Sequence, residues 1–205
     1  MDKRRRADWI AGLIVLSIGA PLLAVGATAF ARGEQARRQA PVRGLIGPQA
    51  YAAFSRGETF PQHYLGNDRT APDFALPMRD GSTWRLSEHR GRVIVMNFWT
   101  VTCQPCMEEM PSLIELATIL QGRRDIELVT ISVDRDWETV RSAVPDGSPL
   151  NVLLDPDRAV VNGKFGTRLY PETWVIDGEG FIRLRVDGQR AWSSALAVQA
   201  FESFR

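Results

Sequence analysis

Hydrophobic and polar positions change character at two places along the chain. An uncharged, largely apolar stretch runs from Trp9 to Ala31, and a mixed stretch without a sustained period follows it. From Ala71 onward, short apolar runs alternate with amphipathic segments, which is typical of a folded α/β domain. We therefore expect a basic N-terminal segment, a membrane anchor, a linker and one folded domain, in residues 1–8, 9–31, 32–70 and 71–205.

The apolar stretch predicts a transmembrane helix. At about 1.5 Å per residue a helix of this length spans roughly 34 Å, enough to cross a bilayer. Basic residues at positions 3–6 precede the stretch, and Trp9 stands at one end, where interfacial aromatic residues are common. The alternative is a cleaved signal peptide, because Ala29-Phe30-Ala31 fits the small-x-small cleavage pattern. The stretch is longer than a usual signal core, so we expect residues 9–31 to remain as a single-pass anchor in the lipid bilayer.

Glycines recur every seven residues in this stretch, at Gly12, Gly19 and Gly26. A stripe of small residues lets two helices approach closely, which supports a weak homodimer through the anchor. The alternative is that glycine is simply frequent in membrane helices.

The folded domain is expected to contain five strands and four helices. Apolar or β-branched runs predict strands, at Val93–Trp99, Ile126–Val133, Val152–Leu154, Thr173–Asp177 and Phe181–Val186. Amphipathic segments predict helices, at Cys103–Gly122, Trp137–Val144, Arg158–Phe165 and Ser193–Phe204. A turn is expected at Asp80-Gly81 and a hairpin around Gly178-Glu179-Gly180. One short helix is also expected in the linker, near Gln49–Ser55.

Composition excludes several classes of function. The 205 residues carry a formal net charge of +1, so no overall field attracts nucleic acid. No glycine-rich phosphate loop follows a strand, and we expect no nucleotide cofactor. The two cysteines cannot close a thiolate zinc site, and the two histidines, His63 and His89, lie far upstream of them. We expect both histidines at the surface and no metal site.

The cysteines themselves point to redox chemistry. Cys103 and Cys106 are separated by two residues and stand where the strand Val93–Trp99 gives way to a helix. The free N–H groups and the dipole at a helix start stabilise a thiolate, which is the nucleophilic form of cysteine. Cys103, at the tip, is expected to attack, and Cys106, one turn further in, is expected to resolve the mixed disulfide. Pro105 suits the first turn of this helix.

Two more positions are candidates for the same site. Glu109 lies three residues after Cys106 on the same helix face, so its carboxylate is placed to take a proton from the thiol. The alternative is an ordinary solvated acid near a helix start. Pro171 stands just before a predicted strand, and the Tyr170-Pro171 sequence is compatible with a cis peptide bond in a tight loop.

Taken together, residues 71–205 resemble the TlpA/ResA-like branch of the thioredoxin superfamily. The resemblance is carried by several short matches: Ala71-Pro72-Asp73-Phe74, Asn97-Phe98-Trp99, Cys103-Gln104-Pro105-Cys106, Glu109-Met110-Pro111, Val133-Asp134 and Tyr170-Pro171 with Val175-Ile176-Asp177. It implies an α/β thioredoxin fold, a central mixed sheet flanked by helices, with a helix–strand insertion that residues 137–155 supply. Many relatives carry Trp before the first cysteine, where this chain has Thr102.

The resemblance also implies a function and a location. It implies that Pro171 is a cis-proline beside the active-site disulfide and that Glu109 is the active-site acid. Members reduce disulfides in client proteins outside the cytoplasm, with electrons from a membrane dithiol carrier. The chain is thus expected in a bacterial cytoplasmic membrane, with its C-terminal domain on the periplasmic side. Pro171-Glu172-Thr173 resembles members that serve cytochrome c assembly, and other members assist copper-site assembly.

Three alternatives remain open. Peroxiredoxins place Pro-x-x-x-Thr-x-x-Cys around their reactive cysteine; Thr100 is correctly spaced here, but Met96 occupies the proline position. A copper-binding module like the Sco proteins needs a later histidine, and none follows Cys106. A disulfide donor commonly has a histidine between its cysteines, whereas Gln104-Pro105 offers no charge, which favours a more reducing protein.

Overall fold

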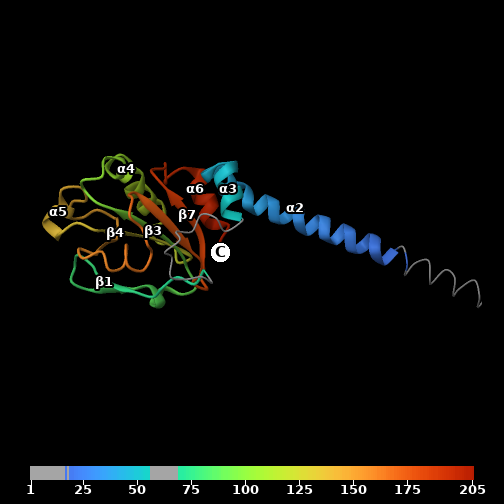
Figure 1. Ribbon diagram of the computed structural model, residues 1–205, viewed down its shortest axis with the longest axis horizontal. Helices are drawn as coiled ribbons and strands as arrows, with labels where there is room; N and C mark the ends of the chain where they lie inside the picture. Colours follow the sequence, from blue (N-terminus) through green and yellow to red (C-terminus); the bar gives the residue numbers. More distant parts are fainter. Residues whose placement is uncertain (1–16, 18, 56–68) are drawn as a thin grey trace, which may run out of the picture. The chain divides into compact units, whose positions relative to one another are not determined.

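The computed structural model describes residues 17, 19–55 and 69–205 (Figure 1). The chain divides between Ala40 and Pro41 into two compact units. Within the described residues, no helix combines the length and the apolarity needed to cross a bilayer. Residues 9–16 and 18 of the predicted anchor, Gly12 among them, and His63 in the predicted linker lie outside the described residues.

The predicted linker contains two helices. Helix α2 (Ala20–Ile46) continues past Ala31, the predicted end of the anchor. Helix α3 (Pro48–Ser55) confirms the short helix expected near Gln49–Ser55. Beyond Ala31 the helix is rich in Ala, Arg, Gln and Glu, which have high helix propensity, and Arg38 pairs with Glu34 at 3.1 Å. Residues 32–46, read as linker because they lack a sustained period, are helical because helix propensity does not need an apolar period.

The second unit is built on a mixed sheet. Its strands, in spatial order, are β5 (Val152–Leu154), β4 (Ile126–Ser132), β3 (Val93–Trp99), β6 (Glu172–Ile176) and β7 (Ile182–Asp187). The central strand β3 runs parallel to β4 and antiparallel to β6. All its residues are buried, which explains its continuous apolar sequence. A small antiparallel pair, β1 (Ala75–Pro77) and β2 (Thr83–Arg85), turns at Asp80-Gly81 and leads into the 3-10 helix η2 (Leu86–His89).

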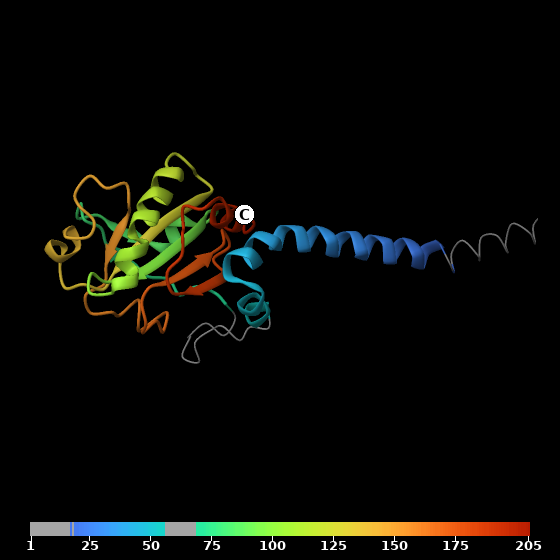
Figure 2. The same ribbon diagram turned by 90° about the horizontal axis from the view of Figure 1, so that it is seen from above.

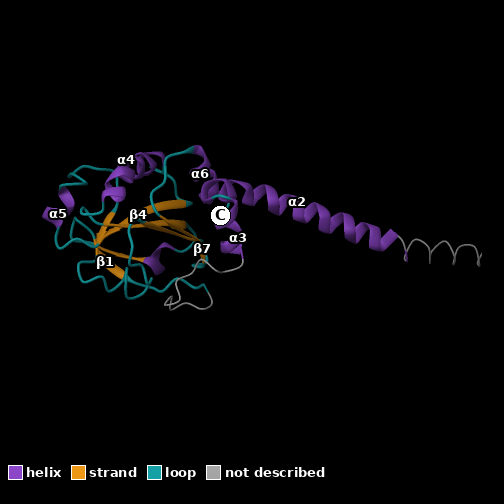
Figure 3. Ribbon diagram, turned by 45° about the horizontal axis from the view of Figure 1, so that its top comes forward, coloured by secondary structure: helices purple, strands orange, loops and turns teal. Residues whose placement is uncertain are grey.

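Helices cover one face of this sheet. Figures 2 and 3 show α4 (Gln104–Ile119) lying over the strands, and α6 (Ala195–Glu202) is on the same side in Figure 3, where β1 is on the other side. Alternate residues of β3 divide between two cores accordingly. Val93, Val95 and Trp99 pack with buried residues of α4 and α6, whereas Ile94, Met96 and Phe98 pack with residues of β1, β2 and the loop before β6.

The insertion expected in residues 137–155 is present as α5 (Trp137–Arg141) and β5. Asp136 caps α5, accepting a hydrogen bond from the Thr139 N–H at 2.9 Å. Strand β5 then adds a parallel edge beyond β4.

The helix predicted at Arg158–Phe165 is wrong, because this segment is a series of turns. Arg158 has a positive φ of 58°. The N–H groups of Val160 and Val161 donate to the buried carboxylate of Asp155, at 3.1 and 2.8 Å. The left-handed backbone at Arg158 is incompatible with a regular α-helix there, and the Asp155 carboxylate holds the turns that follow.

Candidate active site

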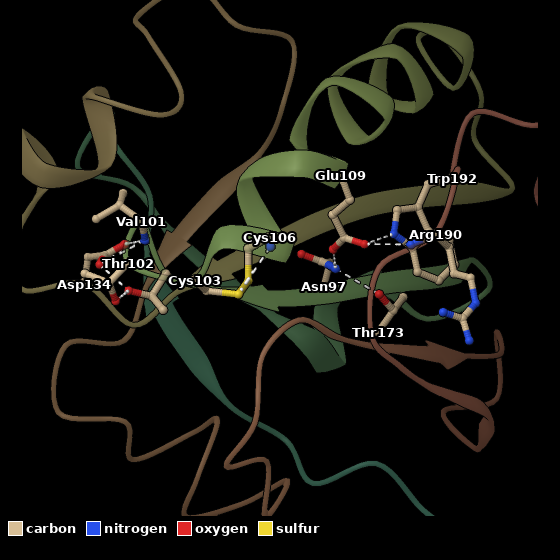
Figure 4. The surroundings of a disulfide bond; sticks show 11 residues. Asn97, Val101, Thr102, Cys103, Cys106, Glu109, Asp134, Thr173, Arg190 and Trp192 are labelled. Carbon is tan, nitrogen blue, oxygen red and sulfur yellow. Dashed lines mark hydrogen bonds between the residues drawn. A yellow bond between two sulfur atoms is a disulfide. The ribbon is translucent and has the colours of Figure 1, made fainter.

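The two cysteines lie where β3 gives way to α4, and they form a disulfide (Figure 4). The Cα atoms are 5.3 Å apart. Cys103 is the N-cap residue of α4, and its Sγ accepts a hydrogen bond from the Cys106 N–H at 3.2 Å. Pro105 stands in the first turn, where its missing N–H is of no consequence. One sulfur atom therefore serves both as half of the disulfide and as the cap of the helix.

The two sulfur-bearing residues differ in exposure. Cys106 is fully buried, and Cys103 is partly exposed between exposed Thr102 and exposed Gln104. A client can therefore reach Cys103 first. Cys106 packs in the core cluster that contains Trp99 and residues of α4.

A buried carboxylate holds the loop that precedes Cys103. Asp134, after β4, accepts hydrogen bonds from the Thr100 hydroxyl at 2.6 Å and from the Val101 N–H at 3.1 Å. The Ser132 hydroxyl donates to the same carboxylate at 2.7 Å. Figure 4 shows this group on the far side of the disulfide from Glu109. The end of β3 is thus tied to the end of β4, which positions the loop that leads to Cys103.

Glu109 is buried on α4, with 3% of its surface exposed. Its Oε1 accepts from Asn97 Nδ2 at 2.8 Å, and its Oε2 accepts from Trp192 Nε1 at 2.8 Å and from the Arg190 N–H at 3.1 Å. In Figure 4 the carboxylate points toward Arg190 and Trp192, with Asn97 drawn between it and the sulfurs. The alternative of an ordinary solvated acid is therefore wrong.

Burial raises the pKa of Glu109, and the three hydrogen bonds together with the positive charge of Arg190 oppose that rise. Loss of water around a carboxylate disfavours its charged form. A carboxylate offers roughly four lone-pair positions, and three donors reach this one. The remaining position is on Oε1, the oxygen that faces Asn97. Glu109 therefore keeps the capacity to accept one more proton on that side.

Asn97 connects the strand to this carboxylate. The residue is fully buried in β3, and its Nδ2 donates to Glu109 Oε1 and to Thr173 Oγ1, at 2.8 and 2.9 Å. Its Oδ1 is buried and has no hydrogen-bond partner among the described residues. In Figure 4 this oxygen points toward the side of Cys106.

The segment before β6 forms another boundary of the site. The Tyr170–Pro171 peptide bond is cis, as the resemblance implied for Pro171. Tyr170 packs against the core cluster that contains Cys106. Leu169, just before it, is 85% exposed. Glu172 follows and is buried, with Arg185 Nε donating to its carboxylate.

Sequence reasoning found the cysteines and Glu109 but missed part of the network around them. Asn97 was noted only as part of a motif, and Arg190 and Trp192 were not singled out. The Trp192 indole reaches Glu109 across 83 residues of sequence, and no local spacing signals such a contact. His89 is only partly exposed, because its ring stacks on Trp84 at 4.4 Å and its Nδ1 lies 2.7 Å from Glu127.

Known proteins resemble the domain in sequence. Residues 68–185 match the AhpC/TSA family. The thiol-disulfide oxidoreductase ResA of Geobacillus thermodenitrificans is 32% identical over 120 residues, which are 58% of this chain and 68% of that protein.

Solved structures resemble it in fold. A protein from Chlorobium tepidum named as the thiol:disulfide interchange protein DsbE is 25% identical, with a TM-score of 0.57 over 66% of this chain and 96% of its own. The exposed lipoprotein thioredoxin Etrx1 of Streptococcus pneumoniae is 26% identical, with a TM-score of 0.54 over 62% of this chain and 98% of its own. The thioredoxin fold expected for residues 71–205 is confirmed.

Proposed function

Because this chain belongs to the AhpC/TSA family and is a thiol-disulfide oxidoreductase of the ResA kind, we propose that it reduces disulfides in client proteins outside the cytoplasm. The observation that carries this proposal is the arrangement of the two cysteines. A partly exposed Cys103 caps α4, and a fully buried Cys106 lies one turn behind it. An exposed nucleophile backed by a shielded thiol suits disulfide exchange with a large partner.

The proposed reaction starts from the reduced protein. The Cys103 thiolate attacks one sulfur of the client disulfide, which forms a bond between Cys103 and that sulfur and releases the other client sulfur as a thiolate. The Cys106 thiol then loses its proton, and its thiolate attacks Cys103 Sγ. The intramolecular disulfide forms, and the second client sulfur leaves. The client gains two electrons, and this protein loses them.

Glu109 is the proposed proton acceptor for Cys106. Its unfilled lone-pair position lies on Oε1, on the side of Asn97. Burial raises the pKa of Glu109 toward that of a thiol, which favours proton transfer between the two. Pro171, which is buried, is proposed to shape the client-binding surface, to which exposed Thr102 also contributes.

Electrons are proposed to come from a membrane dithiol carrier, with the chain anchored through residues 9–31 in the cytoplasmic membrane of a bacterium. The basic residues at positions 3–6 support this orientation, although Arg32, Arg37 and Arg38 follow the span. The similar Etrx1 protein is described as an exposed lipoprotein. Pro171-Glu172-Thr173 resembles members that serve cytochrome c assembly, so we propose this process for the chain rather than copper-site assembly.

Trapping of mixed disulfides tests the assigned roles. Cys106→Ser removes the resolving thiol, so this variant should accumulate mixed disulfides with clients, visible on non-reducing gels. Cys103→Ser should accumulate few or none. Equal trapping by the two variants would contradict the roles of attacker and resolver.

Labelling of intact spheroplasts tests the location. A membrane-impermeant thiol reagent should modify reduced Cys103 without lysis, because Cys103 is partly exposed. Modification that occurs only after lysis would place the domain in the cytoplasm. Retention in membranes after a high-salt wash would separate an anchor from a cleaved signal peptide.

Peroxide reduction is the competing activity within the same family. In peroxiredoxins the threonine of the motif helps to bind peroxide beside the thiolate, but here the Thr100 hydroxyl donates to Asp134 at 2.6 Å. Met96, at the position of the motif's proline, is fully buried in β3. A peroxide-consumption assay should therefore show no turnover linked to Cys103.

A further inference from the structure

The side-chain oxygen of Asn97 is an acceptor without a donor. Asn97 is fully buried, and its Oδ1 has no hydrogen-bond partner within the part of the chain that the structure describes. Leaving a buried acceptor unpaired costs roughly 1–3 kcal/mol, so most such groups in proteins are paired. The structure is that of the oxidised protein, in which Cys106 Sγ is bonded to Cys103 and carries no hydrogen.

The orientation of the Asn97 amide follows from its neighbours. Nδ2 lies 2.8 Å from Glu109 Oε1 and 2.9 Å from Thr173 Oγ1. Rotating the amide by half a turn would place Oδ1 against Glu109, which in its ionised form only accepts. The oxygen must therefore face away from Glu109, and Figure 4 shows it pointing toward the side of Cys106.

Reduction creates the missing donor. When the disulfide opens, Cys106 gains an S–H group inside a site that excludes water, since Cys106 is fully buried. A buried thiol is a weak donor that needs an acceptor nearby. Both Glu109 and Asn97 stand on that side of the sulfur atoms, but the one vacant position on Glu109 is needed to receive a proton. Asn97 Oδ1 accepts no hydrogen bond from any of the described residues.

We propose that Asn97 is a positioning residue for the resolving thiol, with Oδ1 accepting the hydrogen bond of reduced Cys106 while Nδ2 holds Glu109 Oε1. This proposal rests on the proposed exchange reaction and adds a residue to it. The amide then fixes both partners of the proton transfer, the thiol that gives the proton and the carboxylate oxygen that receives it. It also favours the reduced protein, because Oδ1 is paired only when the disulfide is open.

The charged groups around this thiol come from two elements. Glu109 faces it from α4, and Arg190, in the segment after β7, lies close enough to lower the pKa of Glu109. Replacing Asn97 by a neutral residue of similar shape leaves Arg190 in place but also removes the Nδ2 hydrogen bond that lowers the pKa of Glu109. The redox equilibrium therefore reports on the whole amide, whereas the S–H stretching band of Cys106 reports on Oδ1.

Asn97→Leu tests the proposal in the full chain, equilibrated with reduced and oxidised glutathione. Removing Oδ1 takes away an unpaired acceptor from the oxidised form and a hydrogen bond from the reduced form, so both effects favour the disulfide. The equilibrium should shift toward the oxidised protein by about tenfold or more, and tenfold corresponds to a potential about 30 mV more negative. An unchanged equilibrium, or a shift toward the reduced form, would overturn the role of Asn97.

Thr130→Val is the matched control. Thr130 is buried in β4 directly beside Asn97 in the sheet, and its hydroxyl donates to the Asn151 carbonyl instead. The variant also replaces a buried polar group by an apolar one, and its redox equilibrium should match the wild type. An equal shift in both variants would show a general effect of core polarity and would refute the proposal.

Infrared spectroscopy gives a second measurement that does not depend on the stability of Asn97→Leu. In Cys103→Ser, Cys106 is the single thiol of the chain. Its S–H stretching band should lie at the lower frequency of a hydrogen-bonded thiol, and Asn97→Leu should move it up. A band at the frequency of an unbonded thiol in Cys103→Ser would exclude the hydrogen bond. If the wild type reaches no equilibrium with glutathione, the proposed exchange reaction fails and the infrared band still tests Asn97.

Discussion

Glu109 and Glu172 are both buried, but on opposite faces of one sheet and with different partners. Burial raises the pKa of both carboxyls. Glu172 accepts a hydrogen bond from the cationic side chain of Arg185, whereas Glu109 accepts only from neutral donors, the amide of Asn97 among them. Protonating Glu172 would break its ion pair with Arg185, whereas protonating Glu109 breaks no ion pair among the described residues. The neutral hydrogen-bond donors of Glu109 therefore suit a group that gains and loses a proton.

The largest difference between the two should be in the rate of exchange. Glu109→Gln keeps the shape but removes the base, so resolution of the mixed disulfide by Cys106 should slow by about 10²–10⁴-fold. Glu172→Gln should exchange near the wild-type rate. Stopped-flow tryptophan fluorescence of each reduced variant during its oxidation by a small disulfide measures both. Glu108→Gln, which changes an exposed neighbour, is the control. A wild-type rate in Glu109→Gln would mean that Glu109 is not a base in the exchange reaction.

Replacing Glu172 should cost more stability than replacing Glu109, which is the reverse of the order expected for the exchange rate. Glu172→Gln leaves Arg185 facing a neutral group, and breaking a buried ion pair from one side costs about 3–5 kcal/mol. We expect a loss near the lower end, about 3 kcal/mol, because Arg185 also contacts Asp187 at 2.8 Å. Glu109→Gln should cost less, since an amide oxygen still accepts from Trp192. Urea unfolding checks this order.

A surface ion pair provides the control for that measurement. Asp146→Asn removes the partner of Arg79 at 3.0 Å, at a carboxylate that is 70% exposed. Exposed pairs contribute about 0–1 kcal/mol, so this variant should unfold close to the wild type. A loss in Glu172→Gln no larger than this would mean that the pair contributes little.

The pH dependence of the unfolding free energy should reveal the raised pKa of Glu109. Its folded-state pKa is raised above the ordinary value of 4.5, so its contribution to stability is fully present below pH 4.5. That contribution is lost as the pH rises through the raised pKa. The unfolding free energy of the wild type relative to Glu109→Gln should therefore fall as the pH rises above about 4.5. A rise would contradict the direction of the shift.

The smallest effect should come from the one charge near Glu109. Arg190 is partly buried, its guanidinium donates to the Gln189 carbonyl, and its positive charge lowers the pKa of Glu109. Arg190→Gln keeps the backbone N–H that binds Glu109 and removes the charge. The pH at which exchange reaches half its maximum should rise by a few tenths of a unit. A fall would mean that the charge acts in the other direction.

Much of the fold was predictable from the sequence because its signals are local. The continuous apolar run Val93–Trp99 and the glycine-flanked hairpin after β6 need no distant partner to be recognised. The turns at Arg158–Phe165 were mistaken for a helix because Asp155, outside the segment, binds the backbone that the periodic pattern assigned to a helix. Residues 32–46 were missed for the opposite reason, since propensity alone makes them helical.

The candidate site, like the fold, was predictable only where its signals are local. Spacing along one helix was enough to place Glu109 on the face of Cys106. No sequence signal predicts that Trp192 and the Arg190 N–H donate to that carboxylate, across 83 and 81 residues of sequence. Only the packing of the segment after β7 against α4 brings these two neutral donors to the carboxylate that Asn97 already binds. Whether the acid was solvated or buried therefore required the three-dimensional structure.

The cap formed by Cys103 Sγ makes the start of α4 a built-in reporter of redox state. The Cys106 N–H donates to this sulfur at 3.2 Å, so each change in the sulfur's bonding and charge reaches a backbone proton directly. A thiolate accepts more strongly than a disulfide sulfur. The amide resonance of Cys106 should thus move downfield and exchange with solvent more slowly when Cys103 is an anion. Heteronuclear NMR of one backbone position can follow the enzyme through its cycle without an added probe.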